Sequence, residues 1–538
     1  MAAKTYDAII VGGGHNGLVA GFYLARAGLS TLILERRPFV GGACNTEEFA
    51  PGFRASTGAY VLSMLREAIW RDMRLARRGI VVDPAGPTLN LFPDGAHYYL
   101  GEDMAANVDE TARFSAADAR ALPAFERHLG EMVQGVIPSF NWTAPDPRMR
   151  SLGDLRELAR WGRIGILQRR HLADLAFLFS TSATQLLSER FESEHVKAAL
   201  GWHAINDSVA GPSTPGTAYV LLHDHASEEA EGGVRQWGFV RGGMGRLTAV
   251  MADATREAGC DIRCDADVER VLTKGGRAVG VQLADGQELR ARRVLSNADP
   301  KRTFLTLCDR ADLPAEFVAR IEAYRCMGTS IKINLALREL PYVKGLPEGG
   351  VQPYHTGIME LNAFIADMDF QQAQAVQGIA ADPAHIELCF PTVHDPSLAP
   401  GGKHIITIDV NSQPYVLRDA EWDDIKEDRA DRAIATIAEQ FPKLPDLIEH
   451  RQVVTPLDME RLMGLTGGHA LHGDMAPDQL LFLRPTRGWA NYRTPIDGLY
   501  LCGAGTHPGG GVSGANGRNA AREVLRDARR PRKSGARR

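Results

Sequence analysis

A strand, a glycine-rich turn, a helix and a second strand follow one another within the first forty residues, and this unit constrains the fold more than any other stretch. The apolar run Tyr6–Val11 leads into Gly12, Gly14 and Gly17, which fill a G-x-G-x-x-G pattern ahead of a helical stretch. A second apolar run ends on Glu35, 18 positions after Gly17. This order and spacing are typical of a βαβ unit that binds a dinucleotide.

Each residue of the unit has a physical role in this interpretation. Gly12 permits a tight turn, Gly14 lets the backbone approach a pyrophosphate, and Gly17 lets the helix pack closely on the strand. The N-terminus of the helix offers unpaired N–H groups and the positive end of a dipole to the anion. Glu35 would hold the ribose hydroxyls. The alternative is a glycine-rich turn in an ordinary βαβ unit.

A basic pair and a double glycine come directly after this unit. Arg36 and Arg37 precede a turn that ends on Gly41 and Gly42. Glycines allow the backbone to pass close to a diphosphate, and an arginine can neutralise it. We expect Arg36 and Gly42 to contact the nucleotide; a surface turn with two solvated arginines is the alternative.

The length and charge of the chain limit its architecture and its partners. At 538 residues it exceeds what one compact core usually supports, so we expect two intertwined domains. Hydrophobic content of 44% and charged content of 24% are ordinary for a globular protein. The net charge of −5 argues against a general nucleic-acid binder.

The cysteines do not form a redox pair in the sequence. There are seven, scattered along the chain, and none belongs to a C-x-x-C motif. This suits a reducing compartment and disfavours a dithiol that works with a flavin. Only Met1–Thr5 precede the first strand, and no uncharged stretch reaches the roughly 18 residues of a membrane span, so we expect a soluble, cytoplasmic protein.

The middle of the chain from about 85 to 222 has a helical character. Residues 115–134 show a helical apolar pattern, and the stretch 151–179 mixes leucine and isoleucine with five arginines between 156 and 170. Such a basic amphipathic stretch can lie on an anionic membrane surface and draw a lipophilic substrate from the bilayer. A helix with one face on the core and a solvated basic face is the commoner alternative.

A second glycine cluster lacks the features of a second dinucleotide site. Gly243 and Gly245 follow a strand, but Thr248 stands where the third glycine belongs, and no acid is well placed beyond it. A three-stranded antiparallel meander follows, with strands expected at 267–271, 278–283 and 288–295 and an Asp-Gly turn between the last two. The backbone of Val268 is well placed to meet an adenine edge if the meander packs on the first βαβ unit.

Residues from about 303 to 451 read as a mostly antiparallel sheet backed by helices. Apolar strands are expected at 330–337, 385–389 and 404–410, and a helix at 428–441. Such a sheet can form the floor of a substrate cavity. No catalytic triad, P-loop or metal-ligand cluster appears, and we read the near-pair His469 and His472 as structural.

The last strand also runs through glycines into a helix. Residues 498–502 form an apolar strand, Gly503 and Ala504 follow it, and a glycine run precedes Val512 and a helix that extends to 525. The N-terminus of this helix would face a flavin ring, where its dipole can stabilise negative charge on the reduced ring. His507, at the start of the glycine run, is the one catalytic candidate, as a flavin-edge donor or proton relay; a loop-anchoring histidine is the alternative.

Taken together, the two ends of the chain resemble the flavin oxidoreductase family of bacterial-type phytoene desaturases, carotenoid isomerases and retinol saturases. The resemblance is carried by Val11–Leu18, by Glu35-Arg36-Arg37 with Gly41-Gly42, and by Thr506–Val512. It implies FAD as the cofactor and redox chemistry at carbon. It also implies that Asn16 belongs to the cofactor site with Gly12, Gly14, Gly17, Glu35, Arg36, Gly42, Val268, Gly503, Ala504 and Val512.

The expected fold is α/β, with a discontinuous Rossmann-like FAD-binding domain and an interleaved α+β substrate domain. The FAD-binding domain is predicted from residues 1–84, 231–302 and 456–525, and the substrate domain from 85–230 and 303–455. A basic disordered tail is predicted at 526–538.

The expected function is an FAD-dependent oxidoreductase that transfers hydride at a carbon of an apolar small molecule. The flavin performs the chemistry and the protein orients the substrate; the motifs specify no electron acceptor and no metal. Two alternatives stay open: a flavin-stabilised binding or regulatory protein with little turnover, and a non-redox flavin-dependent isomerase. Peripheral membrane contact through 151–179 is compatible with each.

Overall fold

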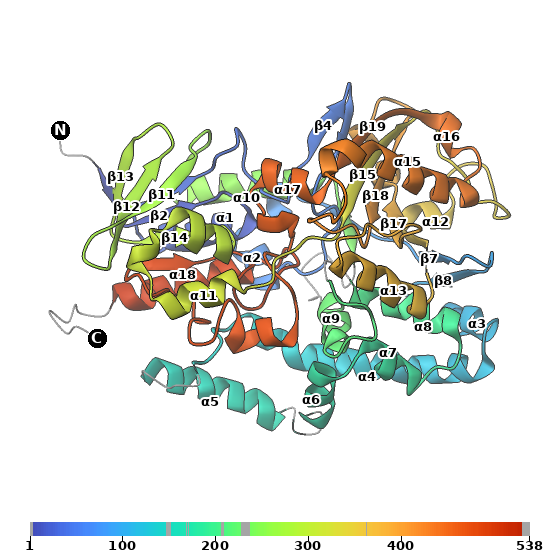
Figure 1. Ribbon diagram of the computed structural model, residues 1–538, viewed down its shortest axis with the longest axis horizontal. Coiled ribbons are helices and arrows are strands. Elements are labelled where there is room, and N and C mark those ends of the chain that lie inside the picture. The colour runs from blue at the N-terminus through green and yellow to red at the C-terminus, as the bar shows by residue number, and fades with distance from the viewer. Residues whose placement is uncertain are drawn as a thin grey trace.

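The computed structural model describes residues 4–146, 152–167, 169, 172–205, 209–226, 237–361 and 363–529. Two sheets organise the chain, one on each side of the molecule in Figure 1, and a group of helices lies below the second. Among the described residues, no helix is both long and apolar enough to cross a membrane.

The first sheet is fully parallel and assembles strands that lie far apart in the sequence. Its order is β10-β3-β2-β14-β20, and the bounds are β2 (Ala8–Val11), β3 (Thr31–Leu34), β10 (Cys260–Arg263), β14 (Val294–Ser296) and β20 (Leu499–Leu501). Every residue of β2, β3, β14 and β20 is buried, as expected for a parallel sheet covered on both faces. Helices α1 (His15–Arg26), α10 (Met244–Glu257) and α18 (Ala515–Ala528) share an apolar core with it.

The predicted meander is present on the other face of this sheet. Strands β11 (Val268–Thr273), β12 (Ala278–Leu283) and β13 (Glu288–Ala291) pair antiparallel, and β1 (Thr5–Tyr6) adds to β13 in parallel. The single strand expected at 288–295 is wrong, because the chain leaves the meander after Ala291 and enters the parallel sheet as β14. The two short strands therefore belong to different sheets.

The second sheet has seven strands in the order β19-β15-β18-β17-β16-β7-β8. All its pairs are antiparallel except β16 with β7. Its bounds are β7 (Thr88–Leu91), β8 (His97–Leu100), β15 (Ile331–Leu337), β16 (Ile358–Leu361), β17 (Ile386–Cys389), β18 (His404–Val410) and β19 (Ile448–Val454). The wholly helical character expected for 85–222 is thus wrong at its start, since β7 and β8 complete this sheet.

Side-chain alternation explains how the central strand β15 divides its two faces. Ile331, Ile333 and Leu335 pack into the apolar core beneath α15 (Trp422–Gln440). On the opposite face Lys332 pairs with Asp409 at 2.8 Å, and Asn334 accepts a hydrogen bond from Thr407 at 2.9 Å. Burial of polar groups on this face is possible because they are paired.

The remaining strands and helices lie around the two sheets. Strands β4 (Glu47–Ala50) and β5 (Phe53–Ala55) form a hairpin, and β6 (Val82–Pro84) pairs antiparallel with the distant β9 (Gly238–Val240). The helices are α2 (Glu67–Asp72), α3 (Met104–Ala112), α4 (Ala116–Phe140), α5 (Leu152–Leu167), α6 (Leu172–Ser180), α7 (Ala183–Ser188), α8 (Glu194–Gly201), α9 (Thr217–Asp224), α11 (Ala315–Glu322), α12 (Pro353–Thr356), α13 (Ile365–Val376), α14 (Pro391–His394), α16 (Leu444–Leu447) and α17 (Pro456–Met463).

Two predicted boundaries differ from the structure, and a third falls outside the described residues. The amphipathic stretch at 151–179 contains two helices, α5 and α6. Disorder predicted from residue 526 is wrong for 526–528, because α18 continues to Ala528; residues 530–538 lie outside the described part of the chain. The domain boundary predicted between 230 and 231 also lies outside it.

The apolar face of β15 supplies a stability test. Ile333→Ala removes a fully buried side chain from the centre of the second sheet and is expected to cost about 2–5 kcal/mol. Thermal unfolding of the purified protein measures the loss. Val416→Ala, at an exposed position, is the matched control and should stay within about 0.5 kcal/mol of the parent. Equal effects of the two variants would contradict the assignment of this core.

Candidate active site

The turn between β2 and α1 has the geometry expected of an anion-binding loop. Gly12 has φ of +97°, which a residue with a side chain rarely adopts, and α1 begins three residues later at His15. A Cβ on Gly17 would clash with the carbonyl oxygen of Gly12. The loop at Gly41 and Gly42 folds back over this turn, and the Gly41 N–H donates to the Gly13 carbonyl at 3.0 Å.

Glu35 lies at the end of β3 with both carboxylate oxygens turned to backbone donors. Oε2 accepts from the Gly13 N–H at 2.7 Å, and Oε1 accepts from the Arg37 N–H at 2.9 Å. The side chain is only 6% exposed. The carboxylate is therefore held beside the glycine turn, where an acceptor for ribose hydroxyls is needed.

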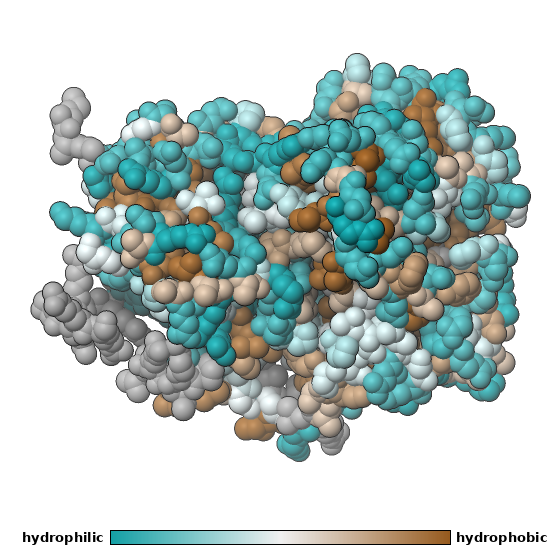
Figure 2. All heavy atoms as spheres, viewed as in Figure 1, coloured by the Kyte–Doolittle hydropathy of each residue, from teal (hydrophilic) through white to brown (hydrophobic). Residues whose placement is uncertain are grey.

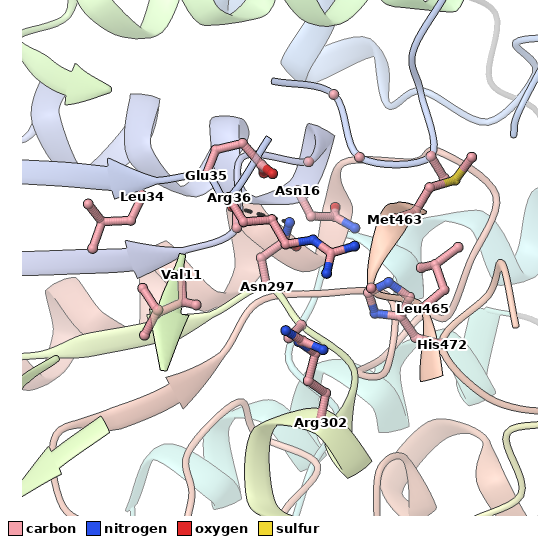
Figure 3. A pocket seen from close by; sticks show the side chains of 18 of the residues that line it. Val11, Asn16, Leu34, Glu35, Arg36, Asn297, Arg302, Met463, Leu465 and His472 are labelled. Atoms are coloured by element: carbon pink, nitrogen blue, oxygen red, sulfur yellow. Dashed lines mark hydrogen bonds between the residues drawn. The ribbon is translucent and has the colours of Figure 1, made fainter. Parts of the chain in front are cut away.

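A pocket of about 870 Å³, including its opening, runs along the carboxyl edge of the parallel sheet. The described residues that line it come from three distant segments of the chain: Val11, Gly12, Gly14, His15, Asn16, Leu34, Glu35, Arg36, Gly41, Gly42, Ala43, Ala266, Asp267, Val268, Asn297, Ala298, Arg302, Leu307, Met463, Gly464, Leu465, Ala470, His472 and Ala504. In Figure 3, Val11 and Leu34 lie on one side, Met463, Leu465 and His472 lie on the other, and Asn16, Arg36 and Asn297 lie between.

Two guanidinium groups face the middle of this pocket. Burial lowers the pKa of Arg36, and the positive charge of Arg302 lowers it further, so the two cations sense each other. Like charges that converge on a cavity are stabilised by an anion between them, and a diphosphate supplies one. Arg37, the other member of the basic pair, is directed elsewhere, toward Glu47 at 2.6 Å.

Asn16 joins the N-termini of two helices. It lies in the first turn of α1, and its side-chain oxygen accepts from the Gly517 N–H in the first turn of α18, at 3.5 Å. Asn16 is 2% exposed and lines the pocket. The positive ends of two helix dipoles therefore converge on the same region, which favours a negatively charged ligand there.

Two histidines that line the pocket, His15 in the first turn of α1 and His472 in a distant loop, are neutral. Burial lowers the pKa of His15 to about 4, with a further contribution from His472, and burial likewise lowers the pKa of His472 to about 4. Both imidazoles are therefore uncharged near neutral pH. Nδ1 of His15 lies 3.5 Å from the Cys44 sulfur, and burial raises the pKa of that thiol to about 12.

The segment after β20 contributes unequally to the site. Ala504 lines the pocket, whereas Gly503 packs against the Asn297 backbone, where a Cβ would lie 2.6 Å from the carbonyl oxygen. Val512 is half-buried and packs on the core between the parallel sheet and its helices. Arg484, fully buried, donates from Nε to the Ala504 carbonyl at 2.9 Å and holds this strand end in place.

His507 is buried beneath α5 and does not line the pocket. Its Nε2 donates to the Ser139 carbonyl at 2.9 Å, and its ring lies 5.6 Å from that of Trp161. Burial lowers its pKa to about 4. These contacts are those of the loop-anchoring alternative; a catalytic role for His507 stays a prediction.

Several residues that line the pocket are not predicted by the sequence. Asn297 and Arg302 follow β14, and the rule that ligands bind at the carboxyl ends of parallel strands would have found them had β14 been assigned to that sheet. His472 was read as structural, and no sequence signal links it to the site, because it arrives from a loop of a different segment. Asp267 precedes Val268 and carries no motif of its own.

The second glycine cluster serves packing. Thr46 Oγ1 accepts from the Gly245 N–H at 2.9 Å, and a Cβ on Gly243 would clash with the same side chain. Thr248, in the third-glycine position, donates to the Cys44 carbonyl at 2.8 Å. The N-terminus of α10 is thus closed by the chain itself. In the described part of the chain, no group of histidine, cysteine and acidic residues could hold a metal ion.

A parallel sheet with a glycine turn at its carboxyl edge, a buried acid beside that turn and two arginines on the same pocket is typical of a dinucleotide-binding protein. The chain belongs to the flavin-containing amine oxidoreductase family, whose family model matches residues 17–525. FAD is the cofactor, and the residues present fit it: the helix ends and the Arg36–Arg302 pair suit its diphosphate, and Glu35 suits its ribose.

Known relatives cover almost the whole chain. Pyridine nucleotide-disulfide oxidoreductase domain-containing protein 2 of Mus musculus is 38% identical over 551 residues, 97% of this chain and 94% of that protein. A limonene dehydrogenase component of Castellaniella defragrans is 28% identical, over 97% and 95%. Prolycopene isomerase of Daucus carota is 25% identical, over 95% and 78%. The resemblance to the phytoene desaturase and carotenoid isomerase group is confirmed.

A solved structure has the same fold. An oxidoreductase from Methanosarcina mazei superposes with a TM-score of 0.62 at 17% identity, over 96% of this chain and 99% of that one. The α/β class with an FAD-binding fold is confirmed. The seven cysteines are all free, and burial raises the pKa of each thiol, so none is poised as a nucleophile.

The close approach at Gly17 gives a cofactor-binding test. Gly17→Val places a branched side chain against the Gly12 carbonyl, which is backbone and cannot move aside, so FAD affinity should fall at least about tenfold. Flavin absorbance per protein after gel filtration measures it. Gly130→Ala, in a helix with open space around the glycine, is the control and should keep full flavin content. A Gly17→Val protein with normal flavin content would exclude this close packing.

His507 can be tested without removing its anchoring bond. In His507→Gln the side-chain amide can still donate to the Ser139 carbonyl, but it cannot relay a proton. If the side chain only anchors the loop, the rate of anaerobic flavin reduction and the bound-flavin spectrum should stay within about twofold of the parent. A reduction rate lower by tenfold or more, with the flavin still bound, would support the proton relay instead.

Proposed function

We propose that this FAD-dependent oxidoreductase transfers a hydride at a carbon atom of an apolar small molecule. The observation that carries the proposal is the distribution of charge along the pocket. The charged lining residues, Glu35, Arg36, Asp267 and Arg302, come from the segments 11–43 and 266–307. The lining residues of the third segment are uncharged at neutral pH: Met463, Gly464, Leu465, Ala470, His472 and Ala504.

The division of labour follows from this distribution. The bound flavin supplies the hydride acceptor or donor. Arg36 and Arg302 would bind its diphosphate, Glu35 would bind its ribose, and the backbone of Val268 would meet its adenine. The imidazoles of His15 and His472 are uncharged and so cannot form an ion pair with a charged substrate. An apolar molecule has the smallest desolvation cost on binding beside such groups.

The names of two relatives support an apolar substrate. Limonene dehydrogenase and prolycopene isomerase specify limonene and prolycopene, and both compounds are hydrocarbons. The second name also favours a second candidate for this chain, an isomerisation that needs flavin without net electron transfer. The two candidates share a cofactor and a substrate class, and they differ in whether the flavin ends the reaction reduced.

The substrate class is tested by mixing the purified holoprotein anaerobically with limonene, with a carotene and with a primary alkylamine. We expect the oxidised flavin absorbance to bleach with an apolar compound and to persist with the cationic amine, because burial of an unpaired charge is costly. Product analysis by chromatography accompanies each mixture.

Three results would redirect the assignment. Bleaching by the amine alone would contradict an apolar substrate. A rearranged product with no bleaching would identify the isomerase. Flavin that stays oxidised with every compound, and that chemical reductants reduce normally, would favour the flavin-stabilised binding protein.

A further inference from the structure

The outward face of α5 is apolar although it is exposed. Leu155 is 53% exposed, Leu158 is 40% and Ile166 is 66%. They make up three of the ten exposed large hydrophobic side chains in the described part of the chain, yet they occupy a single helix. Scattered exposed hydrophobic residues are normal, but a group on one helix face marks an interaction surface.

Helical geometry collects these side chains into a stripe. At 100° per residue, Leu155, Ala159, Gly162 and Ile166 fall within one narrow sector, with Leu158 at its border, and all five are exposed. Arg156 and Arg163 are also exposed and lie seven residues apart, so they form one edge of the stripe. No exposed position of α5 in the described residues is acidic.

The opposite face of α5 is fixed to the body of the protein. Glu157 is buried and contacts Arg526 of α18 at 2.8 Å and Arg160 at 3.1 Å. The indole N–H of Trp161 donates to the Thr143 carbonyl at 3.2 Å. A buried carboxylate leaves its arginine partners only at high cost, so the helix cannot roll to bury its stripe.

The helix lies at the rim of the molecule, away from both sheets (Figure 1), and hydrophobic atoms show along the same rim in Figure 2. In the described structure, the outer face of α5 is open to solvent and is not covered by another element. The inner side of the same helix packs on His507, whose loop continues from Ala504 at the pocket.

We propose that the outer face of α5, defined by Leu155, Leu158, Ala159, Gly162 and Ile166 with Arg156 and Arg163, docks onto an anionic lipid bilayer. An apolar stripe with a basic edge suits a helix that lies in the headgroup region, with leucine and isoleucine in the acyl boundary and arginine on lipid phosphates. The overall charge of −5 opposes such a surface, so the local arginines are needed.

A bilayer fits this face better than a second copy of the chain. An antiparallel two-fold contact would bring the same stripe on both copies together and place their arginine edges on the same side, where like charges repel. An anionic headgroup layer instead neutralises every arginine at once. Docking would also hold the FAD pocket close to the bilayer, in which apolar molecules dissolve. Membrane binding itself does not depend on catalytic turnover.

Flotation of the holoprotein with vesicles tests the proposal. We expect binding to vesicles of phosphatidylcholine with phosphatidylserine, weaker binding to phosphatidylcholine alone, and a decrease at high salt, because salt screens exposed charge. The triple variant Leu155→Gln, Leu158→Gln, Ile166→Gln should bind at least about tenfold more weakly. The double variant Arg156→Gln, Arg163→Gln should lose the preference for phosphatidylserine.

Matched controls separate this face from general surface effects. Phe370→Gln with Val376→Gln removes two exposed hydrophobic side chains from α13, and Arg77→Gln removes an exposed arginine elsewhere; all should leave vesicle binding unchanged. Flavin absorbance and the unfolding temperature show that each variant is folded. Both readouts are independent of any substrate, so failure here is distinguishable from failure of the proposed reaction.

Two outcomes would overturn the docking proposal. The first is no flotation with either vesicle, or equal flotation of the α5 and control variants. The second is a dimer in solution, detected by light scattering, that the triple α5 variant dissociates; that result would assign the face to a second copy of the chain.

Discussion

Parallel pairing of β14 with both β2 and β20 is the constraint on which the site depends. Leu295 of β14 lies in register with Ile10 on one side and with Tyr500 on the other. Three segments separated by hundreds of residues therefore end at one edge of one sheet. The glycine turn, the loop of Asn297 and Arg302, and Ala504 meet there because all strands of a parallel sheet point their carboxyl ends the same way.

The electrostatics of the site follow from the same arrangement. Helix α1 and helix α18 begin at that edge, and Asn16 ties their first turns together, so positive dipole ends gather where Arg36 and Arg302 also converge. Burial also keeps the lining imidazoles of His15 and His472 uncharged. The positive charge of the described lining residues therefore comes from arginine side chains and helix N-termini rather than from histidine.

Local patterns predicted those features that depend on neighbouring residues. The glycine spacing and Glu35 lie within one βαβ unit, and the Asp-Gly turn sets a hairpin, so both could be recognised in sequence. Prediction was wrong where short strands gave little periodicity: β7 and β8 were missed in a helical region, and 288–295 was read as one strand although it divides between two sheets. A four-residue apolar run does not reveal which sheet it will join.

The sequence by itself determined a dinucleotide-binding unit, because the turn at Gly12, the close packing at Gly17 and the acid at Glu35 follow from residue type and spacing. FAD in particular was implied by the resemblance of both ends of the chain to a flavin oxidoreductase family. Only the tertiary structure decided which distant residues complete the site. Arg302 and His472 reach the pocket through strand order and loop packing, whereas His507 does not line it and its Nε2 donates to the Ser139 carbonyl. Neither long-range convergence nor burial can be read from one segment, since both arise only when separate segments pack together.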